Sequence, residues 1–171
     1  MKALKLILTV ILVSSSQLIF GQQTSSPWDK WNYLIGEWVG EGNGQPWKGE
    51  GKFSFQTDLD GKILVRKNKT VFPATDKTPE TTHTDLLIVY QGEKDQQAIY
   101  FDNEGHTIKY KVSFNDKSIV LTGDIMQNAP RFRLSYTTID AKTVNISFEM
   151  ASSQKPEEFK MYLEGKSIKV K

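Results

Sequence analysis

The sequence runs Leu34-Ile35-Gly36-Glu37-Trp38-Val39-Gly40-Glu41-Gly42 at positions 34–42, and this run predicts a β-strand. Alternate side chains of a strand point to the same face, so Trp38 shares its face with Gly36, Gly40 and Gly42. A large indole between residues without side chains suits a strand that bends sharply or lies close to another backbone. We therefore expect Trp38 to be enclosed by a strongly curved sheet.

Further alternating runs follow, separated by turn signals such as Asp60-Gly61 and Asn115-Asp116. Helical patterns do not alternate with these runs, which argues against a parallel sheet. The sequence therefore predicts an all-β fold, an antiparallel up-and-down β-barrel of about ten strands. The expected strands are 34–42, 48–55, 63–72, 84–90, 97–102, 106–114, 118–122, 131–137, 143–150 and 159–163, with 167–170 extending the last or forming a closing edge. Residues 73–82 form a long loop, a candidate flap at the barrel mouth, and 124–130 form a second loop.

Ser26-Pro27-Trp28-Asp29 predicts the start of a short N-terminal helix, with Ser26 as the cap and Pro27 at the first helical position. Trp28, Trp31 and Leu34 follow at a spacing that aligns them on one side of a helix or 3₁₀ turn. We expect this segment to plug one end of the barrel, which is a structural role rather than a binding role.

The first 21 residues have the pattern of a cleaved signal peptide. Lys2 and Lys5 precede an apolar stretch at 6–13 that residues 18–20 extend, and Gly21 is a suitable cleavage position, with a site near Ser16 as the alternative. The apolar stretch is too short to remain as a membrane-spanning anchor. The sequence thus predicts export to the periplasm or outside the cell, and a single barrel domain over 22–171.

Charge and composition limit the classes of partner that the mature domain is expected to bind. Without residues 1–21 the chain keeps 20 basic and 20 acidic side chains, so we expect neither nucleic-acid binding nor stable membrane insertion. The chain has no cysteine, which rules out disulfides, thiolate metal sites and a lipoprotein anchor. A domain of this length can bury enough surface to be stable without disulfides, and a monomer is the oligomeric state we expect.

Residues 33–42 resemble the opening strand, LxGxWxGxG, of a bacterial domain-of-unknown-function family with a lipocalin-like, calycin-type barrel. Weaker similarity lies in 61–66, 132–136, 144–150 and 161–165. The wider superfamily includes lipocalins, fatty-acid-binding proteins and nitrobindin-type haem barrels, so the resemblance implies a cavity for a hydrophobic or planar ligand. The chain departs from lipocalins proper, because it has no disulfide and has denser glycines around Trp38.

The two histidines, His83 and His106, do not support a metal or haem site. Nitrobindin-like barrels ligate haem through a histidine near the C-terminal end, and none follows His106 here. A protein zinc site usually needs three or four ligands, and no His-x-x-x-His spacing occurs. His106 shares the parity of Ile108 and is a candidate interior residue near a turn. The alternative makes both histidines polar groups on the barrel rim, and no cofactor or metal is predicted.

Arg66 is the most informative polar candidate inside the barrel, since it shares the parity of Leu64 and Phe72. Inward arginines of fatty-acid carriers bind carboxylates, so an acidic headgroup would suit Arg66 if it faces the lumen. Beside Lys67 and Lys69 it could equally face solvent. The candidate lumen residues are Trp38, Phe53, Phe55, Arg66, Tyr90, Tyr100, His106, Tyr110, Phe132 and Phe148, although aromatic residues at such positions are often plain core.

Three functions follow from these features. The first is an exported barrel that binds a small hydrophobic or amphipathic ligand in its lumen. The second is a filled barrel that acts through its surface, because Leu87 and Val89 lie on the face opposite Leu86 and Ile88, so this strand would need a partner surface outside. The third is an isomerase or hydrolase of a lipid-like substrate. No Gly-x-Ser-x-Gly elbow occurs. Carboxylates such as Asp85, Asp102 and Glu149 could pair across strands for acid–base catalysis, but spacing alone does not show such pairs, so no catalytic residue is predicted.

Overall fold

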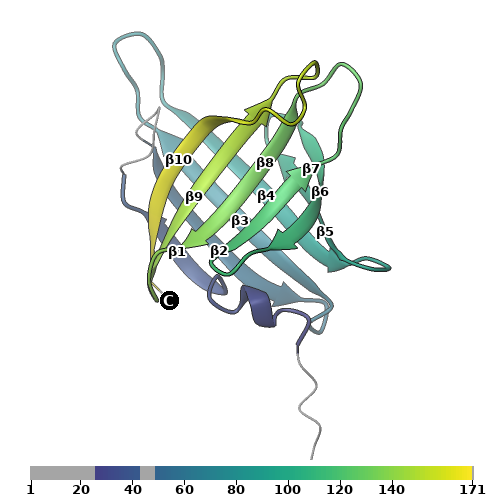
Figure 1. Ribbon diagram of the computed structural model, residues 1–171. Coiled ribbons are helices and arrows are strands. Elements are labelled where there is room, and N and C mark those ends of the chain that lie inside the picture. Colours follow the sequence, from purple (N-terminus) through teal and green to yellow (C-terminus); the bar gives the residue numbers. More distant parts are fainter. Residues whose placement is uncertain (1–25, 43–48, 171) are drawn as a thin grey trace, which may run out of the picture.

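The computed structural model describes residues 26–42 and 49–170 (Figure 1). The predicted signal peptide, 1–21, lies outside the described residues, as do 22–25, 43–48 and 171. The described chain has one 3₁₀ turn, η1 (Asp29–Trp31), followed by ten strands. These are β1 (Gly36–Gly40), β2 (Glu50–Asp58), β3 (Ile63–Phe72), β4 (Thr81–Gln91), β5 (Gln96–Asp102), β6 (Thr107–Phe114), β7 (Ser118–Gly123), β8 (Arg131–Thr138), β9 (Thr143–Ala151) and β10 (Lys160–Lys169).

The ten strands form a closed antiparallel up-and-down barrel, as predicted. Each strand pairs with the next along the chain, and β1 closes the barrel by pairing with both β2 and β10 (Figure 1). Residues 167–169 extend the last strand, because β10 runs without a break except for an irregularity between Met161 and Leu163. A closed sheet has no free edge, so every strand has paired neighbours on both sides.

The strand register brings inward side chains from separate strands into rows. One row joins Trp38, Phe53, Asn68, Asp85 and Asp102 across β1 to β5. The next row, closer to the closed end, runs from Phe55 through Arg66 and Leu87 to Tyr100. The hairpin connections therefore place polar and aromatic side chains side by side inside the barrel.

Trp38 is enclosed, at 1% exposure. Its indole stacks on Phe53 at 5.8 Å with the rings 5° from parallel, and its Nε1 donates to the Leu34 carbonyl at 2.8 Å. Gly36 has φ 125°, a conformation that side chains disfavour, and Gly40 lies against the backbone of Gly51. The glycines next to Trp38 thus serve the bend and the close approach that the sequence predicts.

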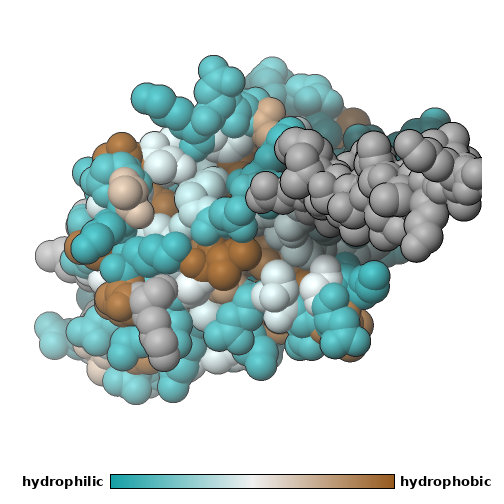
Figure 2. Space-filling model, turned by 90° about the horizontal axis from the view of Figure 1, so that it is seen from below, coloured by the Kyte–Doolittle hydropathy of each residue, from teal (hydrophilic) through white to brown (hydrophobic). Residues whose placement is uncertain are grey.

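The N-terminal segment closes one end of the barrel. Trp28, Trp31 and Leu34 are buried, and Trp31 packs against Phe55 and Phe114. The Trp28 indole donates to the Gly61 carbonyl at 2.8 Å. Seen from below, the described surface of this end is mostly hydrophilic, with scattered hydrophobic side chains, one group of them near the centre (Figure 2).

The predicted N-terminal helix is wrong in one respect, because the segment forms only a single 3₁₀ turn. The Ser26 side chain does not cap a helix and instead accepts from the Trp28 amide at 3.2 Å. A helix this short cannot offset the cost of nucleation, so burial of the indoles sets the backbone.

The opposite end of the barrel is more open to solvent. Inward side chains there are only half-buried, whereas inward side chains near η1 are almost completely buried. The half-buried ones include Asn68, Tyr100, Ile108, Phe132 and Phe148. The β3–β4, β7–β8 and β9–β10 loops surround this mouth (Figure 1). The barrel is therefore packed at its base, and its inward side chains are more exposed at its mouth, an arrangement that we call a cup.

Among the described residues, no helix is long and apolar enough to cross a membrane.

Candidate functional site

The candidate site is a polar cluster inside the barrel, centred on Arg66 of β3 and Asp85 of β4. Arg66 Nη2 lies 3.2 Å from Asp85 Oδ2, and the two side chains are only 9% and 3% exposed. Asn68 donates to the same carboxylate oxygen at 2.8 Å, and His83 Nε2 lies 3.4 Å from it. The pair is possible inside the barrel because each charge neutralises the other and further hydrogen bonds stabilise the carboxylate.

His83 connects this buried pair to the rim of the cup. Its Nε2 lies 3.0 Å from the Tyr100 hydroxyl, and its Nδ1 lies 3.1 Å from Glu104 in the β5–β6 turn. Tyr100 in turn donates to Asp102 at 3.3 Å, and His106 lies 2.8 Å from Asp102. The polar groups thus form a continuous chain from the interior to the mouth.

Four buried polar atoms of this region lack a hydrogen-bond partner among the described residues. They are Arg66 Nε, Asp85 Oδ1, Tyr110 Oη and Tyr136 Oη. The Tyr136 hydroxyl is close enough to Arg66 to influence its pKa, yet the two do not meet hydrogen-bond geometry. Native interiors rarely leave such atoms unpaired, so the cluster has unused capacity to bind a further polar group.

Aromatic rings surround the Arg66 guanidinium. Its Cζ lies 5.8 Å from the centre of the Phe53 ring and 5.9 Å from that of Tyr136. Phe53, Phe55 and Tyr136 also pack against one another at centroid distances of 5.4 to 6.2 Å. These rings exclude water and attract the cation weakly through their faces.

The environment sets the protonation states of the cluster. Burial alone would raise the pKa of Asp85, but Arg66 and the hydrogen bonds from His83 and Asn68 outweigh it and lower the pKa. The hydrogen bond to Asp85 raises the pKa of His83, against the opposing effect of burial. Burial raises the pKa of the Tyr100, Tyr110 and Tyr136 phenols, so all three remain protonated at neutral pH and can donate.

Eight of the ten candidate lumen residues lie on the inward positions of the strands. Arg66 faces the interior rather than solvent. Trp38, Phe53 and Phe55 are packed in the buried core, while Phe132 and Phe148 stack at 5.4 Å and remain half-buried. The eight are Trp38, Phe53, Phe55, Arg66, Tyr100, Tyr110, Phe132 and Phe148.

Tyr90 and His106 do not line the interior. Tyr90 alternates with the buried Val89 and therefore points outward, where its hydroxyl donates to Gln97 at 2.9 Å. Strand β4 is apolar on both faces, so its composition does not show which face points into the barrel. His106 lies in the turn before β6, where its side chain is 63% exposed and contacts Asp102. This is the rim position that the alternative prediction gave it.

Sequence reasoning missed Asp85, Asn68 and Tyr136 as members of the cluster. Asp85 shares the parity of Leu87 and Val89, so a carboxylate on a buried face was the signal that could have revealed it. Glu149, considered as a possible acid or base, instead lies on the outer face and pairs with Arg133. Among residues 26–42 and 49–170, no group of three or more histidine and carboxylate side chains could hold a metal ion.

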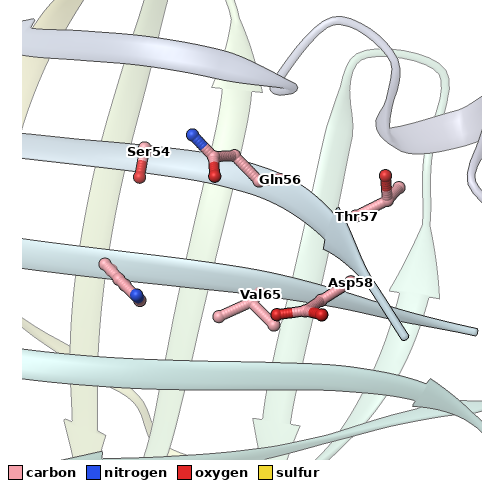
Figure 3. A pocket seen from close by; sticks show the side chains of 6 residues that line it. Ser54, Gln56, Thr57, Asp58 and Val65 are labelled. Carbon is pink, nitrogen blue, oxygen red and sulfur yellow. The ribbon is translucent and has the colours of Figure 1, made fainter. Parts of the chain in front are cut away.

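Two hollows lie outside the barrel. The smaller, about 40 Å³, lies over the outer face of β2 and β3 and has polar walls that include Ser54, Gln56 and Lys67, with room for a few waters (Figure 3). The larger, about 720 Å³, is an open groove between η1 and the β4–β5 hairpin, lined among others by Pro27, Gln96 and Phe114. Neither contains the Arg66 cluster.

A scan against protein-family models and a search of curated proteins found no match to this chain. The structure therefore supports the barrel itself, and the resemblance to a lipocalin-like family has no support from these comparisons.

Proposed function

We propose that the barrel binds a small amphipathic molecule whose polar end is uncharged and reaches the Arg66 cluster from the mouth. The observation that carries the proposal is the set of four unpaired polar atoms, Arg66 Nε, Asp85 Oδ1, Tyr110 Oη and Tyr136 Oη. Leaving a buried polar group unpaired costs about 1–3 kcal/mol, so a ligand that pairs several of them gains binding energy.

The chemistry of these atoms favours an uncharged polar end over a carboxylate. Arg66 Nε can only donate, Asp85 Oδ1 can only accept, and the two phenols can do either. Asp85 already neutralises Arg66, and Glu104 faces the other nitrogen of His83, so a second carboxylate would face these charges without an unpaired cation. A hydroxyl or carboxamide offers both a donor and an acceptor and avoids this repulsion.

The apolar part of the ligand would lie toward the mouth, against Ile108, Phe132 and Phe148. These inward side chains are half-buried, so covering them removes apolar surface from water. Burial of apolar area yields about 25 cal/mol per Å². The packed base beneath them limits how deeply a ligand can enter, which favours a short molecule over a long lipid.

Displacement of a neutral fluorescent probe tests the proposal. The protein is loaded with N-phenyl-1-naphthylamine and titrated with a medium-chain alcohol, the amide and the carboxylate of matched chain length. We expect the alcohol and amide to displace the probe at lower concentration than the carboxylate. Failure of all three to compete, together with a ligand-free native mass spectrum of protein from its own host, would favour a filled barrel whose unpaired atoms bind only water.

We further propose that the protein is exported and that residues 1–21 are removed. The support is the charged start, the apolar stretch and the small residue at position 21. The intact mass of protein recovered from the host's periplasm or medium tests this, since retention of residues 1–21 would contradict export by cleavage.

A further inference from the structure

We propose that the outer wall formed by β3 to β6 docks an acidic amphipathic helix of a partner protein. We call this surface the cationic wall and define it by the outward residues of these four strands. They are Ile63, Val65, Lys67, Lys69, Val71, Thr82, Thr84, Leu86, Ile88, Tyr90, Gln97, Ile99, Phe101, Thr107, Lys109, Lys111 and Ser113. The surface is separate from the interior cluster, and neither proposal depends on the other.

The charges of the cationic wall all have one sign. Its outward positions include four lysines and no aspartate or glutamate. Lys111 pairs with Asp124 at 3.3 Å, whereas Lys67, Lys69 and Lys109 form no ion pair among the described residues. The carboxylates of this part of the chain either lie on inward strand positions, as Asp85 and Asp102 do, or lie in the turns. The wall is therefore a local positive surface on a mature chain whose formal charge is zero.

The opposite wall, on β8 to β10, differs in how its arginines are paired. Arg133 binds Glu149 through two hydrogen bonds of 2.7 Å, and Arg131 lies 2.6 Å from Glu157. Both arginines on that side thus have acidic partners within the chain. Lys67, Lys69 and Lys109 of the cationic wall lack such a partner among the described residues, so acidic groups of another molecule can pair with them.

Apolar side chains fill the centre of the cationic wall between the lysines. Val65, Ile88 and Ile99 lie directly opposite one another on β3, β4 and β5. Leu86 and Phe101 form the neighbouring pair, and Phe101 is 40% exposed. An apolar centre with a charged rim is the anatomy of a protein interface.

The dimensions of the wall match a helix. Across the strands, Lys67 and Lys69 on β3 lie three strand spacings, or about 14 Å, from Lys109 and Lys111 on β6. The two pairs are also offset along the strands, because Lys67 is level with Thr107 and Lys109 with Val65. An α-helix with its side chains is about 10–12 Å wide and would fit between the two lysine rows. Along β4, Leu86 to Tyr90 spans about 13 Å, the length of about nine helical residues. Apolar side chains of such a helix would contact the apolar centre of the cationic wall, while acidic residues on both flanks of the helix pair with the lysines.

Two other occupants fit less well. A second copy of this chain packed face to face would bring four lysines against four lysines. A lipid bilayer would make little contact with the apolar groups of the wall, because most of them are half-buried and long lysine side chains project beside them. Side chains projecting from a helix can reach between the lysines.

Binding of a designed peptide tests the inference. The probe is a fluorescein-labelled helix of about 14 residues with leucines along one face and glutamates on both flanks. A scrambled peptide of the same composition controls for charge alone. We expect saturable binding of the patterned peptide, at least about tenfold weaker binding of the scrambled one, and loss of binding in about 1 M salt.

Variants of the wall complete the test. Lys67→Glu with Lys109→Glu should weaken binding about tenfold or more, and Phe101→Ser should also weaken it. Lys142→Glu with Lys160→Glu carries the same charge change away from the wall and should bind normally, while thermal melts confirm folding of every variant. Equal binding of both peptides, or no effect of the wall variants, would overturn the inference. So would tighter binding to anionic phosphatidylglycerol vesicles, or a dimer in sedimentation that Phe101→Ser abolishes.

Discussion

Arg66 and Asp85 form an ion pair at 3.2 Å inside the barrel, where their side chains are 9% and 3% exposed. Removing one partner of a buried pair leaves an uncompensated charge, which typically costs about 3–5 kcal/mol. We therefore expect Arg66→Leu to lower the free energy of unfolding by this amount in urea denaturation. The double variant Arg66→Leu with Asp85→Leu should lose less, because no isolated charge remains. A single variant as stable as the wild type would contradict the importance of the pair.

His83 should make stability depend on pH. Its folded pKa is raised, chiefly by the hydrogen bond to Asp85, so the protonated ring stabilises the fold. This stabilisation is complete below the unfolded pKa of about 6.5 and disappears as pH rises through the higher folded value. Urea denaturation of wild type and His83→Gln from about pH 5 to 9 should show a stability difference that shrinks as pH rises. The ring-proton shift of His83 in NMR gives the folded pKa directly.

Gly36 and Gly40 flank Trp38 and offer a matched pair of substitutions. Gly36 has φ 125°, so Gly36→Ala should destabilise the barrel by about 1–3 kcal/mol. Gly40 has no such conformation, and an added Cβ would lie 3.4 Å from the Gly51 carbonyl oxygen. Gly40→Ala should therefore cost less. Thermal unfolding monitored by tryptophan fluorescence compares the two, and equal losses would show that φ is not the cause at Gly36.

The plug at the closed end depends on Gln96. Its side chain accepts from Trp31 Nε1 at 2.7 Å and donates to the Pro27 carbonyl at 2.6 Å. Gln96→Leu would leave the buried indole N–H without its partner, at a cost of about 1–3 kcal/mol. We expect faster amide hydrogen exchange in residues 28–35, with exchange in β8 and β9 unchanged. Gln97→Leu, one position along and facing outward, serves as the control.

Much of the barrel could be predicted from the sequence because alternation is a local property. Phe53 and Phe55 alternate with polar residues, and this pattern reveals both the strand and its buried face. The pattern fails on β4, where Leu86 and Ile88 are as apolar as Leu87 and Val89. Only closure of the sheet decides which pair faces inward, and Tyr90 was misplaced for this reason.

The candidate site depends on register, which alternation does not determine. Arg66 and Asp85 lie on neighbouring strands joined by a loop of eight residues between Phe72 and Thr81, and their pairing requires the exact alignment of Arg66 with Leu87. The direction of Arg66 could be predicted, but its partner could not. Because Asp85 of the chain itself supplies the carboxylate for Arg66, we replace the acidic ligand expected from the sequence by an uncharged polar one.

Asp85→Asn offers the sharpest test of the proposed binding site. The substitution keeps the shape of the side chain and its contact with Arg66 but removes the negative charge, so Arg66 becomes an unneutralised cation inside the cup. A ligand carboxylate would then replace the missing charge and bind Arg66 directly. We expect the preference in probe displacement to reverse, with the matched carboxylate now competing better than the alcohol. Asp102→Asn, which alters a rim carboxylate bound to His106, should keep the wild-type order. If Asp85→Asn folds, as judged by its thermal melt, and still prefers the alcohol, then Asp85 does not set the charge of the ligand and the Arg66 cluster is not where the polar end binds.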